Sequence, residues 1–325
     1  MNVVQGTVQA VVAAGGESAA RMMERLERRL LEVAGGHGEL LARHAGDTIA
    51  AGGKRLRPLL LFLTAGAPPP ESETLLRSAV AVELVHSATL VHDDVLDGSP
   101  LRRGRPTVMA AGGRLAATAT GDLLFSRAFA ELAGTGSVAA VRVLSQASSE
   151  LAAGELMQRA DAWRTVATER YLERCRLKTG VLFRAACELG GLEGDDEDRI
   201  PGLALFGERI GLAFQLLDDV LDVTGPPERT GKPRGADLLD GTVTLPLILA
   251  RERDSVLGAL DLRTVRTPDD AAEVSGRIAE TGSLEDTRGR ALELVASAKA
   301  ELPDMPAAQR GALELIADGV VERYS

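Results

Sequence analysis

The sequence predicts an all-α protein, and three observations carry that prediction. Aromatic residues make up only 3% of the chain, whereas Ala, Leu, Arg and Glu, which favour helices over sheets, dominate it. The apolar runs 79–96 and 210–221 contain no proline and have the length of buried helices. No alternation of strands with helices is visible. The 325 residues could form one large domain or two, and 45% apolar content is ample for a core.

Apolar periodicity and glycine or proline breaks predict the order of the elements. Residues 1–20 carry little information, and a short or frayed helical start is expected there. Lys178, Thr179 and Gly180 interrupt one helix and suggest a local kink. The stretch 224–242 is rich in glycine, proline and charge, as expected for a mobile lid or connector. Helices are predicted at 21–34, 39–51, 59–65, 75–97, 115–133, 138–158, 168–189, 200–221, 245–251, 271–281, 284–302 and 307–323.

An Asp-Asp-x-x-Asp pattern occurs twice, each time at the C-terminal end of a long apolar helix. The triplets are Asp93, Asp94 and Asp97, and Asp218, Asp219 and Asp222. Residues four apart share a helix face, so the outer two carboxylates of each triplet point the same way. Carboxylates gathered at an apolar helix end repel each other unless a cation joins them. One triplet could be a solvated helix end, but two copies favour sites for Mg²⁺ and a phosphorylated substrate.

The cationic residues are expected to act locally. A net charge of −10 argues against nucleic acid as the main partner, so an anionic substrate needs a local basic cluster or a metal. Gly52–Pro58 and Leu101–Thr107 each bring three cations into a loop, the second directly beyond the first triplet. Arginine forks match phosphate oxygens. Taken alone, each loop could equally be a solvated basic turn, and His86 an ordinary core histidine.

Composition also indicates where the protein is found. Cys175 and Cys187 have no metal-type spacing and are expected to be buried free thiols in a reducing cytoplasm. A membrane span needs a run of about 18 uncharged apolar residues, and no apolar run in the sequence reaches that length. Residues 1–16 lack the basic start of a signal peptide. The sequence therefore predicts a soluble, cytoplasmic protein without a transmembrane segment.

The motifs GGKRLRP, ELVHSATLVHDDVLD, LRRG, KTG, FQLLDDVLD, GK and TLPL follow one another in this order. In this order they resemble the trans-isoprenyl diphosphate synthases, the polyprenyl synthetase family. The resemblance covers about residue 20 to the C-terminus, and it implies a variable segment 1–20 and one synthase domain 21–325. The family fold is a ring of antiparallel helices around a deep cavity, usually in a homodimer. The family condenses isopentenyl diphosphate with an allylic diphosphate through Mg²⁺-dependent ionisation, condensation and deprotonation.

The resemblance also implies roles for individual residues. Asp93, Asp97 and Asp218 would ligate Mg²⁺, while Asp94, Asp219 and Asp222 would act through metal-bound water or orient the metal centre. The allylic diphosphate would be held by Arg102, Lys178 and Lys232. The isopentenyl diphosphate would be held without metal by Lys54, Arg57, His86 and Arg103. Gln215 and the Thr179 carbonyl would face the developing carbocation, and Phe214 would line its pocket.

Two positions depart from the family pattern. Thr242 follows Gly241 where the family usually has a lysine, so one diphosphate contact is lost and affinity or lid closure is expected to be weaker. Gly98 and Ser99 follow the first triplet where many members carry an acid. Neither change removes a metal ligand, so activity is still expected.

Product length in the family depends on the helical turn before the first triplet. Ser87, Ala88 and Thr89 are small, where members that stop at farnesyl typically carry aromatic residues. One turn is about 5.4 Å, close to one isoprene unit, so the product should exceed farnesyl. Deeper in the product cavity, the side chain of Phe125 or Phe129 on the neighbouring helix could block further growth of the chain. The pattern favours a medium or long chain, with a geranylgeranyl product as the alternative.

Two rival functions are weighed against this one. A class I terpene cyclase shares the first triplet, but its second metal site usually mixes Asn, Ser or Thr with Glu. The full second triplet and the cations Lys54 and Arg57 argue against it. A non-catalytic or regulatory partner subunit of a prenyl synthase would tend to lose carboxylates, and this chain keeps all six.

Overall fold

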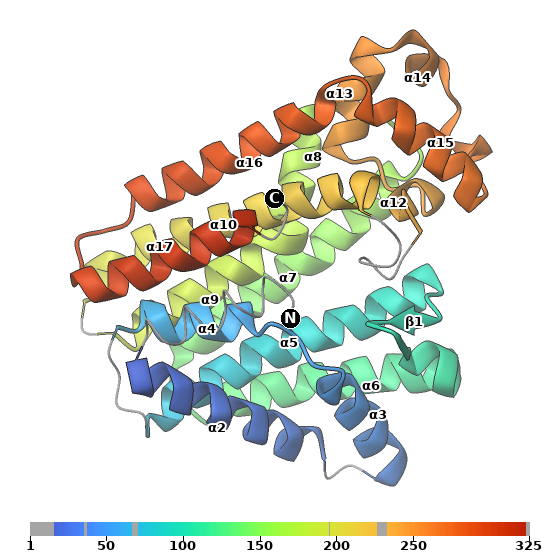
Figure 1. The fold of residues 1–325 in the computed structure, drawn as a ribbon. Helices are drawn as coiled ribbons and strands as arrows, with labels where there is room; N and C mark the ends of the chain where they lie inside the picture. Colours follow the sequence, from blue (N-terminus) through green and yellow to red (C-terminus); the bar gives the residue numbers. More distant parts are fainter. Residues whose placement is uncertain (1–15, 36–37, 67–70, 195, 226–232, 323–325) are drawn as a thin grey trace. The chain divides into compact units, whose positions relative to one another are not determined.

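The structure, a computed structural model, describes residues 16–322 apart from 36–37, 67–70, 195 and 226–232. Within these residues the only strands are two short ones, and every other regular element is a helix. The all-α prediction is confirmed (Figure 1). Contacts divide the chain into two compact units. The prediction of one domain at 21–325 stays a prediction.

The first unit comprises the described residues of Met1–Ser148, Leu182–Gly207 and Leu302–Gly319. Its core is built from apolar side chains of the N-terminal helices, with Leu26, Leu60 and Leu84 fully buried. The elements that lie wholly or mostly in this unit are α2 (Gly16–Ala34), α3 (Glu39–Ala50), α4 (Leu56–Thr64), α5 (Glu73–Asp97), β1 (Leu101–Arg102), β2 (Arg105–Pro106), α6 (Val108–Ala133), α9 (Val181–Leu192), η2 (Glu197–Arg199) and α17 (Ala307–Glu322).

The second unit comprises the described residues of Ser149–Val181, Glu208–Glu301 and Val320–Ser325. Helices α7 (Val138–Asp161) and α10 (Ile200–Thr224) begin in the first unit and end in the second. The other elements of the second unit are α8 (Thr168–Cys175), η1 (Arg176–Gly180), α12 (Ala236–Leu239), α13 (Leu245–Arg253), α14 (Ser255–Ala259), η3 (Leu262–Thr264), α15 (Pro268–Ala279) and α16 (Ser283–Ala300).

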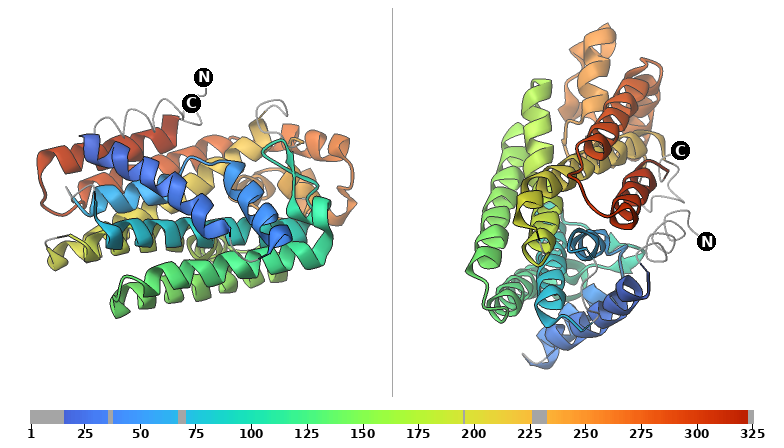
Figure 2. Two further views of the ribbon diagram at one scale, coloured as in Figure 1. Left: turned by 90° about the horizontal axis from the view of Figure 1, so that it is seen from below. Right: turned by 90° about the vertical axis from the view of Figure 1, so that its left-hand side faces the viewer.

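Helix α5 carries the first aspartate triplet at its C-terminal end. The Ser72 side chain caps its start by accepting a hydrogen bond from the Leu75 amide at 3.3 Å. Gly98 ends it in the left-handed conformation, φ 62°, as expected of a helix C-terminus. The following helix α6 runs back alongside α5 within the first unit (Figure 2). It begins at Val108, before the predicted residue 115, because Gly113 kinks it instead of starting it.

The segment after α5, predicted to be a loop, forms a short antiparallel hairpin. Leu101 pairs with Pro106 and Arg102 with Arg105, which leaves a two-residue turn at Arg103 and Gly104. Both turn residues have positive φ, 53° and 74°, as a type I′ turn requires. Glycine adopts this conformation without strain, whereas Arg103 does so at a modest cost. The turn thereby fixes the direction of two neighbouring arginines.

The interruption predicted around Lys178 is confirmed as a π-helical turn. Residues Arg176–Gly180 form η1 between α8 and α9. Such single-turn π-bulges occur within α-helices, often at functional sites. On α7, Gly154 lies against this turn, and a Cβ added there would be 2.8 Å from the Lys178 amide nitrogen. The absence of a side chain at Gly154 therefore allows α7 and η1 to approach closely.

The predicted connector after the second triplet is partly described. Residues 226–232 lie outside the described residues, and the predicted substrate ligand Lys232 is among them. Downstream, α12 is a short helix that the sequence did not predict. Gly241 then contacts the α7–α8 loop, where the Trp163 amide donates to the Gly241 carbonyl at 2.8 Å. A Cβ on Gly241 would lie 2.4 Å from the indole, so only glycine fits there.

Two segments, Glu73–Asp97 and Glu197–Thr224, are long and apolar enough by length and composition to cross a membrane. The sequence prediction counted uncharged runs, whereas these windows tolerate up to two charged residues. In the first, 72% of the window is buried inside the protein, and in the second 44%. Core helices of soluble proteins have the same composition, so the two windows are weak evidence for a membrane span.

Candidate active site

The two aspartate triplets lie in different units and share one burial pattern. In the first, Asp94 is only 4% exposed, whereas Asp93 and Asp97 are accessible to solvent. In the second, Asp219 is only 2% exposed, whereas Asp218 and Asp222 are partly accessible. This is the pattern predicted for carboxylates four residues apart on one helix face. Each triplet therefore offers two accessible carboxylates and buries the middle one.

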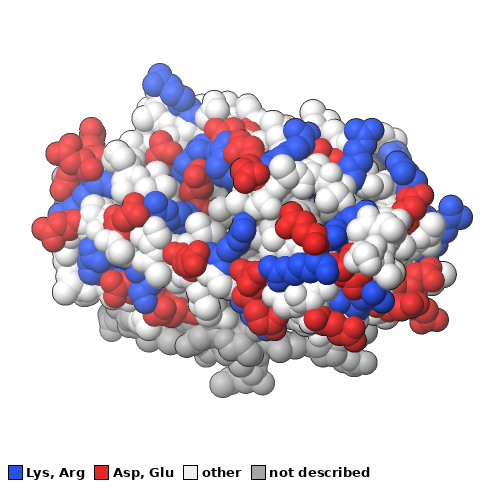
Figure 3. Space-filling model, turned by 90° about the horizontal axis from the view of Figure 1, so that it is seen from above, with Lys and Arg blue, Asp and Glu red and all other residues white. Residues whose placement is uncertain are grey.

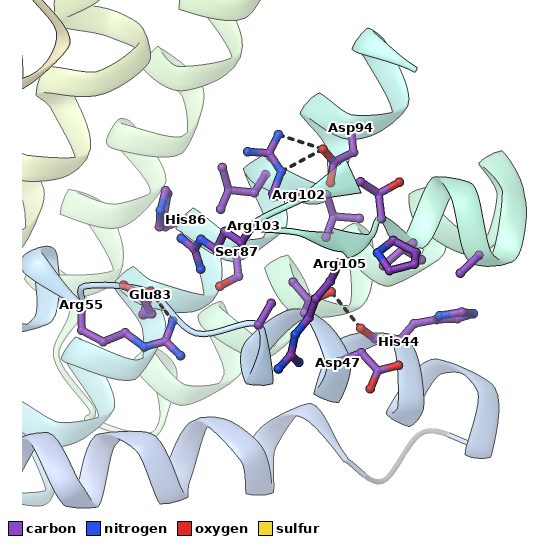
Figure 4. A pocket seen from close by; sticks show the side chains of 18 residues that line it. His44, Asp47, Arg55, Glu83, His86, Ser87, Asp94, Arg102, Arg103 and Arg105 are labelled. Atoms are coloured by element: carbon purple, nitrogen blue, oxygen red, sulfur yellow. Dashed lines mark hydrogen bonds and ion pairs between the residues drawn. The ribbon is translucent and has the colours of Figure 1, made fainter. Parts of the chain in front are cut away.

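Asp94, the buried acid of the first triplet, is held by the hairpin. Its Oδ1 accepts hydrogen bonds from Nε and Nη2 of Arg102, both at 2.8 Å. An ion pair of this kind compensates a carboxylate that burial has removed from water. In the close-up, Arg102 extends to Asp94 while the next residue, Arg103, extends toward His86 (Figure 4). The type I′ turn thus places two neighbouring cations at different parts of the site.

Asp219, the buried acid of the second triplet, has two hydrogen-bond donors. The Tyr171 hydroxyl donates to its Oδ2, and Gln215 Nε2 donates to its Oδ1 at 2.7 Å. Burial nevertheless raises the pKa of Asp219 above its usual value, with the charge of Asp237 acting in the same direction and the two hydrogen bonds opposing it. Gln215 is fixed at its other end, because Thr179 Oγ1 donates to its Oε1 at 2.8 Å.

A basic cluster of Arg55, Arg57, Arg102 and Arg103 acts on His86 in the first unit. Figure 4 shows three of these arginines, Arg55, Arg102 and Arg103, around it. Burial lowers the pKa of His86 well below its usual value, and the positive charges of the four arginines lower it further. His86 is therefore neutral at neutral pH and can act as a hydrogen-bond donor or acceptor among fixed cations. Because the cluster concentrates positive charge, it is suited to bind an anionic ligand.

Arg57 shows most directly that this cluster can take an anion. Its guanidinium lies over the Phe183 ring, 4.4 Å from the centroid, which fixes its orientation. Its Nε is shielded from solvent and has no hydrogen-bond partner among the described residues. Burial lowers its pKa to about 10, despite the nearby charge of Glu83. A buried donor without a partner is costly unless a ligand satisfies it.

Arg55 was not singled out in the sequence, yet it organises the cluster. It has a left-handed φ of 49° and is 5% exposed. Its guanidinium donates to Glu83 and Glu27, each at 2.7 Å, and to the Ile49 carbonyl at 3.0 Å. With a second bond from Nη2 to Glu27, they use four of the five N–H groups of Arg55 and fix the loop that carries Lys54. The one sequence signal was Glu83, an acid inside an otherwise apolar helix, which needs a buried partner.

A cavity of about 300 Å³ opens beside this cluster. Its walls include His86 and Ser87 from α5, Arg103 from the hairpin, and the Arg102–Asp94 pair. That volume is at the lower end of the range for small-molecule sites. Gly53 contributes by lacking a side chain, since a Cβ there would lie 3.2 Å from Arg103 Nη1. Small size and positive charge together suit a short ligand with a diphosphate group.

The remaining predicted residues of the second unit gather around the π-turn. Lys178 Nζ forms an ion pair with Glu155 Oε2 of α7 at 2.7 Å. Thr179, buried in the same turn, bonds to Gln215 on α10, and Phe214 next to it is partly buried. The elements α7, η1 and α10 therefore bring together Lys178, Thr179 and Gln215, which lie up to 37 residues apart in the sequence.

The accessible carboxylates fit a hard divalent cation. Mg²⁺ commonly takes one or two protein carboxylates and completes its shell with water and phosphate oxygens. Each triplet offers such a pair, with its middle acid already compensated or hydrogen-bonded. No three His, Cys, Asp or Glu side chains converge into a full metal site within the part of the chain that the structure describes. The donors present fit a cation shared with a phosphorylated ligand.

The face of the molecule drawn in Figure 3 has no large, purely positive patch. On the face in Figure 3, Lys and Arg side chains alternate with Asp and Glu side chains. With a net charge of −10, the chain as a whole repels a diphosphate. Attraction of an anionic substrate therefore depends on the local basic cluster and on bound metal.

Comparisons with known proteins show the family to which the chain belongs. Residues 39–275 match the polyprenyl synthetase family. The chain is 41% identical over 261 residues to heptaprenyl diphosphate synthase component 2 of Geobacillus stearothermophilus, covering 80% of each. It is 37% identical over 285 residues to geranylgeranyl diphosphate synthase of Methanosarcina mazei, covering 85% of this chain and 87% of the relative. A crystal structure of polyprenyl synthase from Caulobacter crescentus, complexed with calcium and isoprenyl diphosphate, has a TM-score of 0.90 at 36% identity, covering 98% of both chains.

An all-α fold with these relatives defines a trans-isoprenyl diphosphate synthase, an enzyme that transfers prenyl groups. The chain belongs to the polyprenyl synthetase family. The resemblance drawn from the sequence motifs is thereby confirmed. The products in the relatives' names differ, heptaprenyl in one and geranylgeranyl in another, so kinship alone leaves the product length open.

Proposed function

We propose that this enzyme condenses isopentenyl diphosphate with an allylic diphosphate and releases an all-trans polyprenyl diphosphate longer than farnesyl. The observation that carries the proposal is the basic cluster around neutral His86, where Arg57 Nε lacks a partner among the described residues. The cavity of about 300 Å³ is lined by His86, Arg102 and Arg103 of this cluster, so it offers positive charge to a small diphosphate. Lys54, Arg57, His86 and Arg103 would bind the isopentenyl diphosphate there without metal.

The allylic diphosphate would be bound by a separate set of residues. Asp93, Asp97 and Asp218 would ligate Mg²⁺, with Asp94, Asp219 and Asp222 fixing the surrounding groups. When bound, Mg²⁺ would neutralise charge on the departing diphosphate. Arg102 and Lys178 would compensate the same charge, and each already has one acidic partner in the structure, Asp94 and Glu155. Lys232 is proposed for the same role from the family pattern alone.

Loss of the diphosphate leaves an allylic carbocation, which the protein must stabilise and protect. The Thr179 carbonyl and the Gln215 side-chain oxygen, whose amide is held by the Thr179 hydroxyl, would be the negative ends of fixed dipoles. Such dipoles stabilise positive charge where water is excluded. Phe214 would line the same pocket. The isopentenyl double bond then attacks the cation to form the new carbon–carbon bond. A proton leaves the adduct, with the released diphosphate as its acceptor.

Product length is proposed from the turn before the first triplet. Ser87 lines the described cavity, Ala88 is fully buried, and Thr89 is partly exposed. None of the three side chains is large enough to stop a growing chain at farnesyl. Phe125 and Phe129 on α6 are the candidates for the side chains that close the end of the product cavity. Phe125 stacks on His92 with ring centroids 5.8 Å apart. A medium or long product is favoured, and a geranylgeranyl product is the alternative.

Assembly and location are also proposals. We expect a homodimer, as is usual in this family, and a cytoplasmic enzyme. Leu115 on α6 and Leu156 on α7 are 84% and 71% exposed, and apolar side chains this exposed are suited to burial by a second subunit. Equilibrium sedimentation would measure the subunit number directly.

The function is tested by incubating the purified full chain with Mg²⁺, labelled isopentenyl diphosphate and either farnesyl or geranylgeranyl diphosphate. Chromatography of the dephosphorylated products should show labelled polyprenols longer than farnesol. A terpene cyclase would instead release hydrocarbon from the allylic substrate alone. A non-catalytic partner subunit would give no product with either primer, and that result would refute the proposal.

A further inference from the structure

Tyr171 belongs to none of the motifs that identify the family, yet it contacts the second aspartate triplet. It lies on α8, its side chain is fully buried, and its hydroxyl donates to Asp219 Oδ2 on α10. The two residues are 48 positions apart in the sequence, so tertiary packing alone brings them together. This tyrosine therefore links the helix before the π-turn to the helix that carries the triplet.

The Tyr171 ring is itself held in place. The Arg174 guanidinium lies over the ring, 5.3 Å from its centroid. Arg174 is 3% exposed, donates to the Val243 carbonyl, and lies 3.8 Å from the Asp161 carboxylate. With Arg174 fixed on several sides, the ring has little freedom to turn its hydroxyl away from Asp219.

A chain of hydrogen bonds continues from Asp219. Its second oxygen, Oδ1, accepts from Gln215 Nε2 at 2.7 Å, and Gln215 Oε1 accepts from Thr179 Oγ1 at 2.8 Å. The orientation of the Gln215 amide follows from its partners, because the amide nitrogen must donate to the carboxylate and the amide oxygen must accept from the hydroxyl. The order Tyr171, Asp219, Gln215, Thr179 is thus continuous, and all four lie in the second unit.

We infer that Tyr171 is a positioning residue for Gln215. By engaging Oδ2 of Asp219, it fixes the carboxylate so that Oδ1 holds the Gln215 amide with its oxygen beside Thr179. Tyr171 touches no substrate in this scheme and acts only through Asp219. The inference rests on the proposed role of Gln215 and Thr179 beside the carbocation.

Removing the Tyr171 hydroxyl should disturb this chain without disturbing the packing. Tyr171→Phe keeps the ring under Arg174 but leaves Oδ2 of a buried carboxylate without its donor. The carboxylate can then rotate and release the Gln215 amide. A merely structural hydroxyl would affect stability and not the chemical step. Thr287→Val is a matched control, because it removes another fully buried hydroxyl of the same unit, one that donates to the Ser283 carbonyl at 2.8 Å.

The decisive experiment is a double-mutant cycle on kcat. Tyr171→Phe should lower kcat about tenfold while leaving KM for isopentenyl diphosphate unchanged, and Thr287→Val should leave both unchanged. In a Gln215→Ala background the further effect of Tyr171→Phe should shrink to less than about twofold, because the positioned group is gone. An equal loss of kcat in both backgrounds would overturn the inference.

Two further measurements keep the outcome unambiguous. If Gln215→Ala itself leaves kcat unchanged, the proposed role of Gln215 fails. If Gln215→Ala lowers kcat but Tyr171→Phe has the same effect in both backgrounds, only the inference about Tyr171 fails. Urea unfolding of every variant separates loss of folding from loss of positioning. Should Tyr171→Phe not fold, Asp219→Asn tests the same link, because one acceptor oxygen becomes a donor that cannot serve both partners. It should reproduce the selective fall in kcat, and normal kinetics would count against the inference.

Discussion

At the scale of single residues, the middle aspartate of each triplet differs from its neighbours. Asp94 and Asp219 are buried and have partners from the protein itself, Arg102 in one case and Tyr171 with Gln215 in the other. Helix geometry alone predicted that the outer acids share a face. The partners of the middle acids could not be predicted, because neighbouring helices supply them. The repeated motif is thus predictable from the sequence, but the side chains that hold the two buried aspartates are not.

His86 gives a pH-dependent stability that can be measured. Its pKa is lowered in the folded protein, so below about pH 6.5 the unfolded chain binds a proton that the native state does not. Stability should therefore fall as the pH drops from 7.5 to 5.5, by up to about 1.4 kcal/mol from this residue. Urea unfolding should show a weaker pH dependence for His86→Gln than for the wild type. Parallel curves for the two proteins would contradict the lowered pKa.

The turn before the first triplet sets a second test at this scale. Thr89 is partly exposed, so Thr89→Phe can be accommodated and should shorten the main product by at least one isoprene unit, about one helical turn. Ala88 is fully buried, so Ala88→Phe should shorten the product and also destabilise the fold by about 1–3 kcal/mol. Product chromatography and urea unfolding measure the two effects. Leu292→Phe, at a site 48% exposed in the other unit, is the control. An unchanged product profile in both variants would refute this explanation of product length.

At the scale of elements, the long helices were predictable and the short irregular ones were not. Apolar runs and Gly98 marked the course and end of α5, because helix propensity and a left-handed glycine are local properties. The hairpin after it depends on a positive φ at Arg103, which no local preference of arginine indicates. The π-turn was foreseen only as an interruption. Its role in bringing Thr179 to Gln215 depends on α10, which is distant in sequence.

Close packing of α7 on the π-turn predicts a specific glycine effect. Gly154→Ala would place a Cβ 2.8–3.0 Å from backbone and side-chain atoms of Leu177 and Lys178. The helices must then separate, and we expect a loss of about 2 kcal/mol in stability and a fall in kcat. Gly289→Ala, with no atom within 4 Å, should be neutral or stabilising by up to about 1 kcal/mol. Urea unfolding and kinetics distinguish them. Equal behaviour of the two variants would show that the contact is unimportant.

At the scale of the whole molecule, the proposed binding functions are distributed between the two units. The basic cluster lies entirely in the first unit, whereas Lys178, Gln215 and the second triplet lie in the second. The sequence indicated both groups, because each motif is contiguous. It could not indicate Arg55 and Glu83 as a buried pair, since that pairing arises only when α4 packs on α5.

Because the basic cluster is proposed to bind isopentenyl diphosphate without metal, removing the metal should stop product formation but leave the binding of isopentenyl diphosphate largely intact. Chelation by EDTA should lower product formation at least about 100-fold, because the departing diphosphate loses its main charge compensation. Binding of isopentenyl diphosphate, measured by calorimetry, should change less than about threefold, since arginines and His86 provide that site. Asp218→Asn should behave like chelation in both measurements. Loss of isopentenyl diphosphate binding in EDTA would show that metal also serves the basic cluster.

The contact between Trp163 and Gly241 makes one spot of this enzyme visible to spectroscopy. The chain has a single tryptophan, so its whole indole emission originates where the α7–α8 loop meets the backbone after α12. No dye or engineered probe is needed to follow that place. If Mg²⁺ and pyrophosphate leave the neighbouring backbone in position, the emission maximum should stay constant during a titration. A shift of the emission maximum would instead report a rearrangement at the Trp163–Gly241 contact, and stopped-flow mixing would give its rate.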